Sequence, residues 1–237
     1  MLVREHDRVR AGAWMLLRIV NIHKVLLFIS HLFFYLILAM KQSIRERFRL
    51  QTTGAALPLI ATGIGINLIM GELTAIIKIP LYLDSVGTIF IGASCGIYAG
   101  MVCGAMSNLA AGVVFNPAMI FFAPVSVVVG ACAGYFASKN GFSSLPKVTA
   151  FGLLQGIITA VVSAPISAFV FGGITLGGTD FLVLYFRAMG QSVQNSVLYQ
   201  GLASDPIDKC ASYVLVYFIL KQIPDSLRNR FPQSNLR

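Results

Sequence analysis

Long apolar stretches, separated by short groups of polar residues, Gly and Pro, dominate the chain from about residue 50 onward. A membrane-spanning helix needs about 20 mostly apolar residues, because each residue adds about 1.5 Å and the hydrocarbon layer is roughly 30 Å thick. The predicted fold class is therefore an all-α integral membrane protein, a bundle of six transmembrane helices. The six predicted helices cover residues 53–71, 79–96, 98–115, 118–138, 148–171 and 206–223.

A long connection, residues 172–205, separates the last two predicted helices and contains a second, moderately apolar stretch at 181–204. If that stretch crossed the membrane, the basic residues of 225–237 would lie outside the cell. Lys and Arg prefer the cytoplasmic face of a membrane. We therefore expect a surface or re-entrant helix at 181–204.

The chain before residue 50 carries an extra hydrophobic segment of a different kind. Residues 25–40 are apolar except for Ser30 and His31, and basic residues flank both sides. These 16 residues reach only about 24 Å. We expect an interfacial helix, or a natural start of translation at Met40, rather than a crossing. The predicted organisation is a basic N-terminal extension (1–50), a six-helix transmembrane domain (51–224) and a basic cytoplasmic tail (225–237).

Composition supports the membrane assignment. Hydrophobic residues make up 57% of the chain and charged residues 11%, less than half of the roughly 25% usual in soluble domains. This balance excludes a soluble globular enzyme and a disordered chain.

The net charge is +9, and nine of the 18 Lys and Arg precede residue 50. A basic end can bind nucleic acid, but beside apolar spans it more often sets membrane orientation. With residues 41–49 inside, Lys139, Lys147 and residues 225–237 also fall inside. The predicted protein is multi-pass in the cell membrane, with cytoplasmic N- and C-termini and no nucleic-acid partner.

Catalytic residues are scarce in the apolar part of the sequence. All three histidines precede Met40, so the predicted bundle has no Ser-His-Asp or Cys-His system and no His-based metal site. The sequence has no Gly-x-x-x-x-Gly-Lys-Ser/Thr loop for ATP, and its four cysteines show no Cys-x-x-Cys spacing. We expect buried free thiols, no enzyme activity, no cofactor and no metal. Any active uptake must then draw its energy from another protein.

Small residues recur at four-residue spacing in several predicted helices. Close backbone contact through such residues drives helix association in lipid. We expect most of them to pack helices within the bundle. For Ala61 and Gly65 in the first predicted helix, docking on another membrane subunit is the second interpretation. The other small residues at this spacing are Gly92, Gly96, Gly100, Gly104, Gly130 and Gly134.

Polar residues after residue 50 gather in the half of the bundle that the predicted orientation places outside. A channel or proton-driven carrier would have polar groups through its whole depth. The one-sided distribution instead predicts a cup open to the outside. The candidate ligand contacts are Asn67, Glu72, Asp84, Asn108, Asn116, Arg187, Gln191 and Asn195.

Structural roles stay open for several polar residues. Asp84 could cap the second helix, and Asp205 and Asp208 the last one. Asn116 could simply start a helix at Pro117.

The polar residues of the connection 172–205 can be interpreted in two ways. Arg187, Gln191 and Gln194 would share one side of a helix, because they are four and three residues apart. Arg187 could instead pair with Asp180.

Three stretches resemble those of the substrate-binding (S) components of energy-coupling factor (ECF) transporters. They are residues 79–88 (IPLYLDSVGT), 100–108 (GMVCGAMSN) and 204–209 (SDPIDK), and the likeness covers roughly residues 53–224. The resemblance implies six helices with both ends cytoplasmic, in a prokaryotic cell membrane. It also implies that a vitamin-like ligand binds near the outer face.

The same resemblance implies a partner complex of one transmembrane T subunit and two ATPases. In that family the first helix carries an Ala-x-x-x-Ala-type docking face, for which Ala61 and Gly65 are the nearest equivalent. The expected function is substrate capture for uptake, with Asp84, Asn108 and Arg187 as leading ligand contacts. The alternatives are a membrane solute sensor or scaffold, a stand-alone carrier or channel and, least favoured, an intramembrane enzyme.

Overall fold

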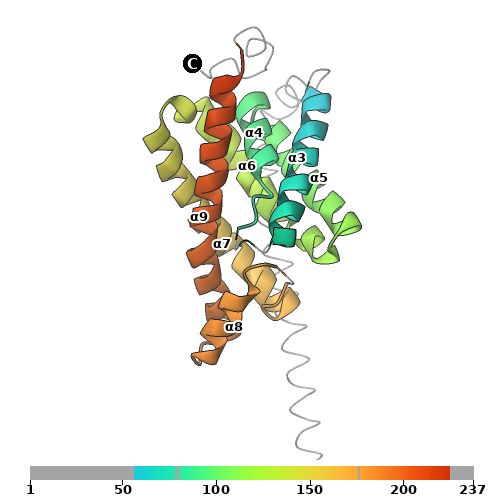
Figure 1. Ribbon diagram of the computed structural model, residues 1–237, viewed down its shortest axis with the longest axis vertical. Helices are drawn as coiled ribbons and strands as arrows, with labels where there is room; N and C mark the ends of the chain where they lie inside the picture. The colour runs from blue at the N-terminus through green and yellow to red at the C-terminus, as the bar shows by residue number, and fades with distance from the viewer. Residues whose placement is uncertain (1–55, 78, 80, 176, 225–237) are drawn as a thin grey trace, which may run out of the picture.

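The computed structural model describes residues 56–77, 79, 81–175 and 177–224, and these residues form helices joined by short connections (Figure 1). The predicted all-α class is confirmed for this part of the chain. The predictions for residues 1–50 and 225–237 lie outside the described residues. The elements are α3 (Ala56–Ile77), α4 (Val86–Cys95), α5 (Ile97–Val114), η1 (Pro117–Phe122), α6 (Ala123–Ser138), η2 (Gly141–Ser143), α7 (Leu145–Phe171), α8 (Asp180–Ala188) and α9 (Val193–Gln222).

Four helical segments are long and apolar enough to cross a membrane. α6 follows η1 without a break, and the two together form one of these four segments. The structure therefore supports a membrane-embedded, all-helical protein. The four segments are Leu57–Ile77, Ile97–Val114, Pro117–Ser138 and Leu145–Phe171.

The prediction of one continuous helix over 79–96 is wrong. α4 begins only at Val86 and has 10 residues, a length of about 15 Å. Residues 79 and 81–85, which the structure describes before α4, are not helical, and Leu83 has a left-handed φ of 47°. The N–H groups of Tyr82 and Leu83 bind the carboxylate of Asp208 on α9, so a tertiary contact replaces the helical bonds that this stretch would otherwise form.

The last helix is longer than predicted. α9 has 30 residues and begins at Val193, so the predicted start at Pro206 lies in its interior. At this proline α9 packs closely against α7, since a Cβ placed on Gly156 of α7 would lie only 2.2 Å from the Cα of Pro206. The predicted helix at 181–204 is divided between α8 and the first turns of α9.

Glycines bring the central helices together, as their spacing predicts. α4 packs against α3, α5, α6 and α9 and is buried except for Phe90. A Cβ on Gly100 of α5 would lie 2.7 Å from the carbonyl oxygen of Gly130 on α6 and 2.7 Å from the Cα of Gly92 on α4. At these contacts the packing leaves no room for a side chain.

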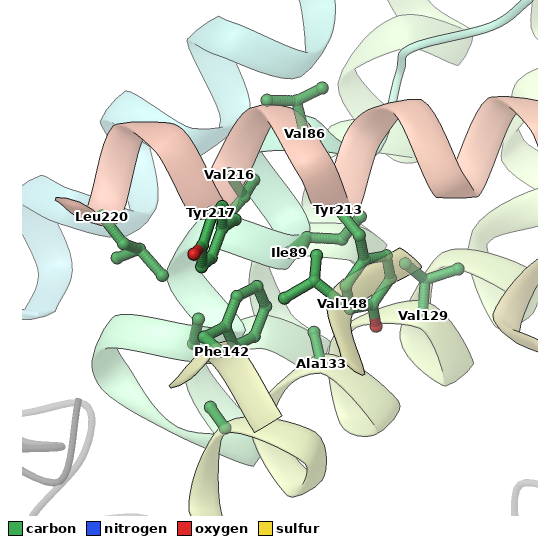
Figure 2. Close-up of a cluster of buried hydrophobic side chains, with 12 residues drawn as sticks. Val86, Ile89, Val129, Ala133, Phe142, Val148, Tyr213, Val216, Tyr217 and Leu220 are labelled. Atoms are coloured by element: carbon green, nitrogen blue, oxygen red, sulfur yellow. The ribbon is translucent and has the colours of Figure 1, made fainter. Parts of the chain in front are cut away.

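An aromatic and aliphatic core fills the end of the bundle at which α9 ends (Figures 1 and 2). Tyr213 of α9 is fully buried there and stacks on Phe142, with ring centroids 5.8 Å apart. Phe136 of α6 stacks on Phe151 of α7 at 4.0 Å. This end of the bundle is therefore closed by packed rings and aliphatic side chains.

Candidate functional site

A buried lysine on α9 anchors the polar part of the bundle. The Lys209 ammonium donates to Asp208 Oδ2 at 2.7 Å, to Ser85 Oγ at 2.7 Å and to Asp84 Oδ1 at 3.4 Å. The side chain of Lys209 is 5% exposed and that of Asp84 is 37% exposed. The three contacts match the three donors of the ammonium, so Lys209 is fully engaged.

Asp208 fixes the connection between α3 and α4. Its side chain is completely buried, and Oδ1 accepts the backbone N–H of Tyr82 at 2.9 Å and that of Leu83 at 2.8 Å. Its other oxygen accepts from Lys209. Because both oxygens are used, one carboxylate joins residues 81–85 to the middle of α9.

A second hydrogen-bonded network continues along α9 toward α8. The Tyr82 hydroxyl contacts Thr179 Oγ1 at the start of α8. Gln200 Nε2 donates to Thr179 Oγ1 at 3.0 Å and to Ser204 Oγ at 2.9 Å. Ser204 Oγ in turn lies 3.2 Å from Asp205 Oδ1 and donates to it.

These residues form what we call the polar cluster, which joins the α3–α4 connection, the start of α8 and the middle of α9. It combines three carboxylates with a single ammonium and so has excess negative charge. Asp84 is its most exposed carboxylate, whereas Asp205 is 5% exposed. The members are Tyr82, Asp84, Ser85, Thr179, Gln200, Ser204, Asp205, Asp208 and Lys209.

Among the predicted ligand contacts, Asp84 belongs to the polar cluster. It does not cap α4, because Ser85 occupies the N-cap position. Asp205 and Asp208 do not cap the last helix either, since they lie well inside α9. The structure thus gives all three carboxylates a tertiary position in place of the capping role that stayed open.

Asn67 holds three helices together. It is 3% exposed, and its Oδ1 accepts from the backbone N–H groups of Gly87 at 2.7 Å and Thr88 at 3.3 Å. Its Nδ2 donates to Thr88 Oγ1 at 2.7 Å and to Ser107 Oγ at 2.8 Å. These four bonds use its whole hydrogen-bonding capacity, linking α3 to α4 and α5.

Asn108 and Asn116 also make structural contacts. Asn108 Nδ2 donates to Ser126 Oγ at 2.6 Å and to the Phe122 carbonyl at 2.9 Å, which ties α5 to α6. Asn116 Oδ1 accepts the N–H of Ala118, which confirms that this residue starts a helix. Its Nδ2 donates to the Thr175 carbonyl at 3.1 Å.

The remaining candidates lie at the edge of the site. Glu72 is half-buried within α3, which runs to Ile77 rather than ending at residue 71 as predicted. Arg187 and Asn195 are exposed and Gln191 is half-buried.

The prediction that Arg187, Gln191 and Gln194 share one helix side is wrong. α8 ends at Ala188, and Gly190, with a φ of 86°, turns the chain before α9 begins. Asp180 binds Thr175 rather than Arg187.

The predicted docking residues face away from the bundle. Ala61 is exposed, and a Cβ on Gly65 would meet no atom within 4 Å. These two small residues therefore do not serve packing between the helices described here. All four cysteines are free, and Cys95 and Cys103 are buried as expected, whereas Cys132 and Cys210 are half-buried.

Sequence reasoning missed most of the polar cluster as a site. A predicted helix start at Pro206 puts Asp205 and Asp208 at the N-terminal end of the last helix, where capping is an open alternative for both. The missed signal is helical spacing across the proline, since Asp205, Asp208 and Lys209 stand three and four residues apart on one helix face.

Comparison of the chain with protein-family models, with curated proteins and with solved structures gives no match. The functional argument therefore depends on the geometry of the site. Within the described part of the chain, no group of three or more His, Cys, Asp or Glu side chains is placed to hold a metal ion.

Proposed function

We propose that this protein is the substrate-capture subunit of an ECF-type uptake transporter in a prokaryotic cell membrane. It binds a vitamin-like small molecule from outside and delivers it with a T subunit and ATPases. The observation that carries the proposal is the polar cluster, a set of buried charged and hydrogen-bonding groups inside a bundle whose long helices are mostly apolar. Polar groups within a membrane bundle are costly, and they usually mark a path or site for a solute.

The two ends of the bundle support capture rather than free passage. All five acidic residues in the described part of the chain lie toward the end that carries α8, or at mid-depth. The opposite end holds the ring-packed core around Tyr213. A solute that enters beside Asp84 would meet this apolar floor, so release to the cytoplasm requires a movement of the whole bundle.

Six segments cross the membrane in this proposal: α3, α5, η1 with α6, α7, α9, and α4 together with the non-helical residues 81–85 that precede it, because α4 by itself is too short. The first residues of α3 and the last of α9 lie at the same end of the bundle, as six crossings require (Figure 1). Lys139, Lys147 and Lys221 lie at that end and agree with a cytoplasmic face. α8 then lies at the outer surface, and the N-terminal turns of α9 extend toward it.

The exposed face of α3 is the proposed docking site for the T subunit. Only 22% of the apolar 18-residue stretch of α3 is buried inside the bundle, against 39–44% for the corresponding stretches of the other three long segments. The open position of Gly65 allows a partner helix to approach its backbone closely. The bundle would tip against this partner to carry the solute inward, and the chain itself would catalyse no reaction.

Reconstitution tests the proposal. The full chain, co-expressed with a T subunit and two ATPases, should co-purify with them and support ATP-dependent solute uptake into proteoliposomes. A Gly65→Leu variant should lose co-purification but keep its thermal stability, because it alters only the open face of α3. Uptake by the protein alone would instead indicate a carrier or channel, and solute binding without ATPase association would indicate a sensor.

A further inference from the structure

α8 exposes one side that consists of large apolar and aromatic side chains and one alanine. These residues recur at helical spacing, so they share one side of α8 and of the turn that ends it. The four large side chains are each 55–62% exposed. A contiguous apolar patch of this kind marks an interaction surface. The members of this surface, which we call the α8 face, are Phe181, Leu184, Tyr185, Ala188 and Met189.

The opposite side of α8 is held by the rest of the bundle. Val183 is 2% exposed and packs in a cluster of buried residues from α7 and α9. The other members of that cluster are Ala164, Ala168 and Val197. At the start of α8, Thr179 belongs to the polar cluster. The α8 face therefore has a fixed direction, away from α7 and α9.

Charged residues border the α8 face without entering it. Asp180 and Arg187 are seven residues apart, about two helical turns, so they lie along the same edge of α8. This edge separates the α8 face from the side that carries Val183, and Arg187 on it is exposed. Because the edge has one charge of each sign, attraction of α8 to a surface depends on its apolar side chains.

The α8 face continues onto the exposed side of α9. Phe186 makes edge-on ring contacts with Tyr185 of α8 and with Tyr199 of α9, in both cases with centroids 5.5 Å apart. From Tyr199, a row of exposed residues runs along α9, on the side opposite to the buried Asp208. In a membrane-embedded bundle this row faces lipid, so the same lipid lies beside the α8 face. The row consists of Tyr199, Leu202, Ala203 and Ile207.

We propose that α8 is an interfacial helix whose apolar face inserts into the lipid of the outer leaflet. Its nine residues span about 14 Å, too short to cross the membrane. Helices in the membrane plane bury an apolar face at the boundary between headgroups and acyl chains and keep charged residues outside it. Tyr residues are also enriched at this boundary. A second protein could cover the α8 face as well, but its continuity with the exposed row of α9 favours lipid.

This lipid contact also affects the polar cluster. The Tyr82 hydroxyl contacts Thr179 Oγ1, and Gln200 Nε2 donates to the same oxygen at 3.0 Å. Insertion of the α8 face into lipid therefore stabilises the segment that borders the cluster. The inference goes beyond the proposed capture function, because it requires only that the bundle is embedded in a membrane. The choice of leaflet follows from the proposed orientation.

Fluorescence quenching tests the lipid contact on the full-length protein in phosphatidylcholine nanodiscs. Trp14 is the sole tryptophan of the chain, so Leu184→Trp in a Trp14→Phe background reports on the α8 face alone. Phosphatidylcholine with brominated acyl chains should quench this tryptophan by roughly half or more, and aqueous iodide should have little effect. Gln194→Trp, at an exposed polar position on α9, is the matched control and should show the opposite pattern.

Hydrogen exchange in the same nanodiscs tests whether lipid stabilises α8. Leu184→Gln combined with Met189→Gln removes apolar surface, but it leaves helix propensity almost unchanged. The amides of α8 should then exchange roughly fivefold faster or more, because the helix loses its apolar contact with lipid. Exchange in α5 and α6 should be unchanged. The control variant Gln194→Met should leave exchange in α8 as in the wild type.

Three outcomes overturn the inference. Quenching of the Leu184→Trp variant by iodide but not by brominated lipid places the α8 face in water. Blue-shifted emission that neither quencher changes places it against protein, such as a second copy of the chain. Unchanged exchange in the double variant shows that lipid does not stabilise α8. Quenching by brominated lipid in a protein that fails to support ATP-dependent uptake would refute the transport role and leave the interfacial helix standing.

Discussion

At the scale of single residues, Asp208 and Lys209 stand out because each uses all of its hydrogen-bonding groups on other elements or on each other. Asp208 accepts from two backbone N–H groups and from the ammonium, and the ammonium also reaches Ser85 and Asp84. In a buried pair of this kind, loss of one partner leaves the other charge uncompensated. The pair is therefore sensitive to single substitutions.

Asp208→Asn should lower the free energy of unfolding by about 3–5 kcal/mol, because an amide cannot neutralise the buried ammonium. Adding Lys209→Met should restore part of this loss, since the uncompensated charge is then absent. Thermal unfolding in detergent measures both effects. Arg187→Gln, at an exposed position on α8, is the control and should change stability by no more than about 0.5 kcal/mol. Similar stability of Asp208→Asn and wild type would contradict the assigned role.

At the scale of helices, the same small-residue spacing serves two purposes. Gly130 of α6 lies against α5, and a Cβ there would be 2.3 Å from the carbonyl carbon and oxygen of Gly100. Gly65 of α3 faces open space. The spacing alone does not distinguish them, because it only places small residues on one helix side.

Gly130→Ala and Gly65→Ala should therefore differ in their effect on folding. The first forces backbone apart and should cost about 1–3 kcal/mol. The second should be neutral or slightly stabilising, since alanine favours a helix more than glycine does. Both are measured by thermal unfolding of the isolated protein. Equal losses in the two variants would mean that α3 packs within the bundle through this face.

At the scale of the whole molecule, charge and polarity define two ends. Lys139 and Lys147 lie near the turn between α6 and α7, and Lys221 lies at the end of α9, beside the ring-packed core. The carboxylates lie toward α8 or at mid-depth. Because Lys and Arg prefer the cytoplasmic face, we expect the end with these lysines to lie inside the cell and α8 to lie outside.

Cysteine labelling checks that orientation. In a background with the four native cysteines replaced by alanine, Arg187→Cys should react with a membrane-impermeant maleimide on intact cells. Lys147→Cys should react only after the cells are permeabilised. Both positions are exposed, so reactivity reports the side of the membrane. The opposite pattern would invert the bundle and place the polar cluster toward the cytoplasm.

The sequence by itself determined the properties that depend on local composition and spacing. Apolar length predicted helices that agree with α5, with η1 and α6 taken together, and with α7 to within about three residues, whereas α3 runs on to Ile77 past its predicted end at residue 71. The start of η1 was also predictable, because Asn116 and Pro117 act on their own backbone.

Tertiary structure decided where distant groups meet. Tyr82 and Leu83 are not helical because Asp208, more than 120 positions later, accepts their N–H groups. α9 continues through Pro206 in close contact with the glycines of α7. That continuation places Asp205, Asp208 and Lys209 in one buried row. Long-range hydrogen bonds and the packing that carries α9 through Pro206 therefore created the polar cluster, because residue spacing along one helix does not specify its partners on other elements.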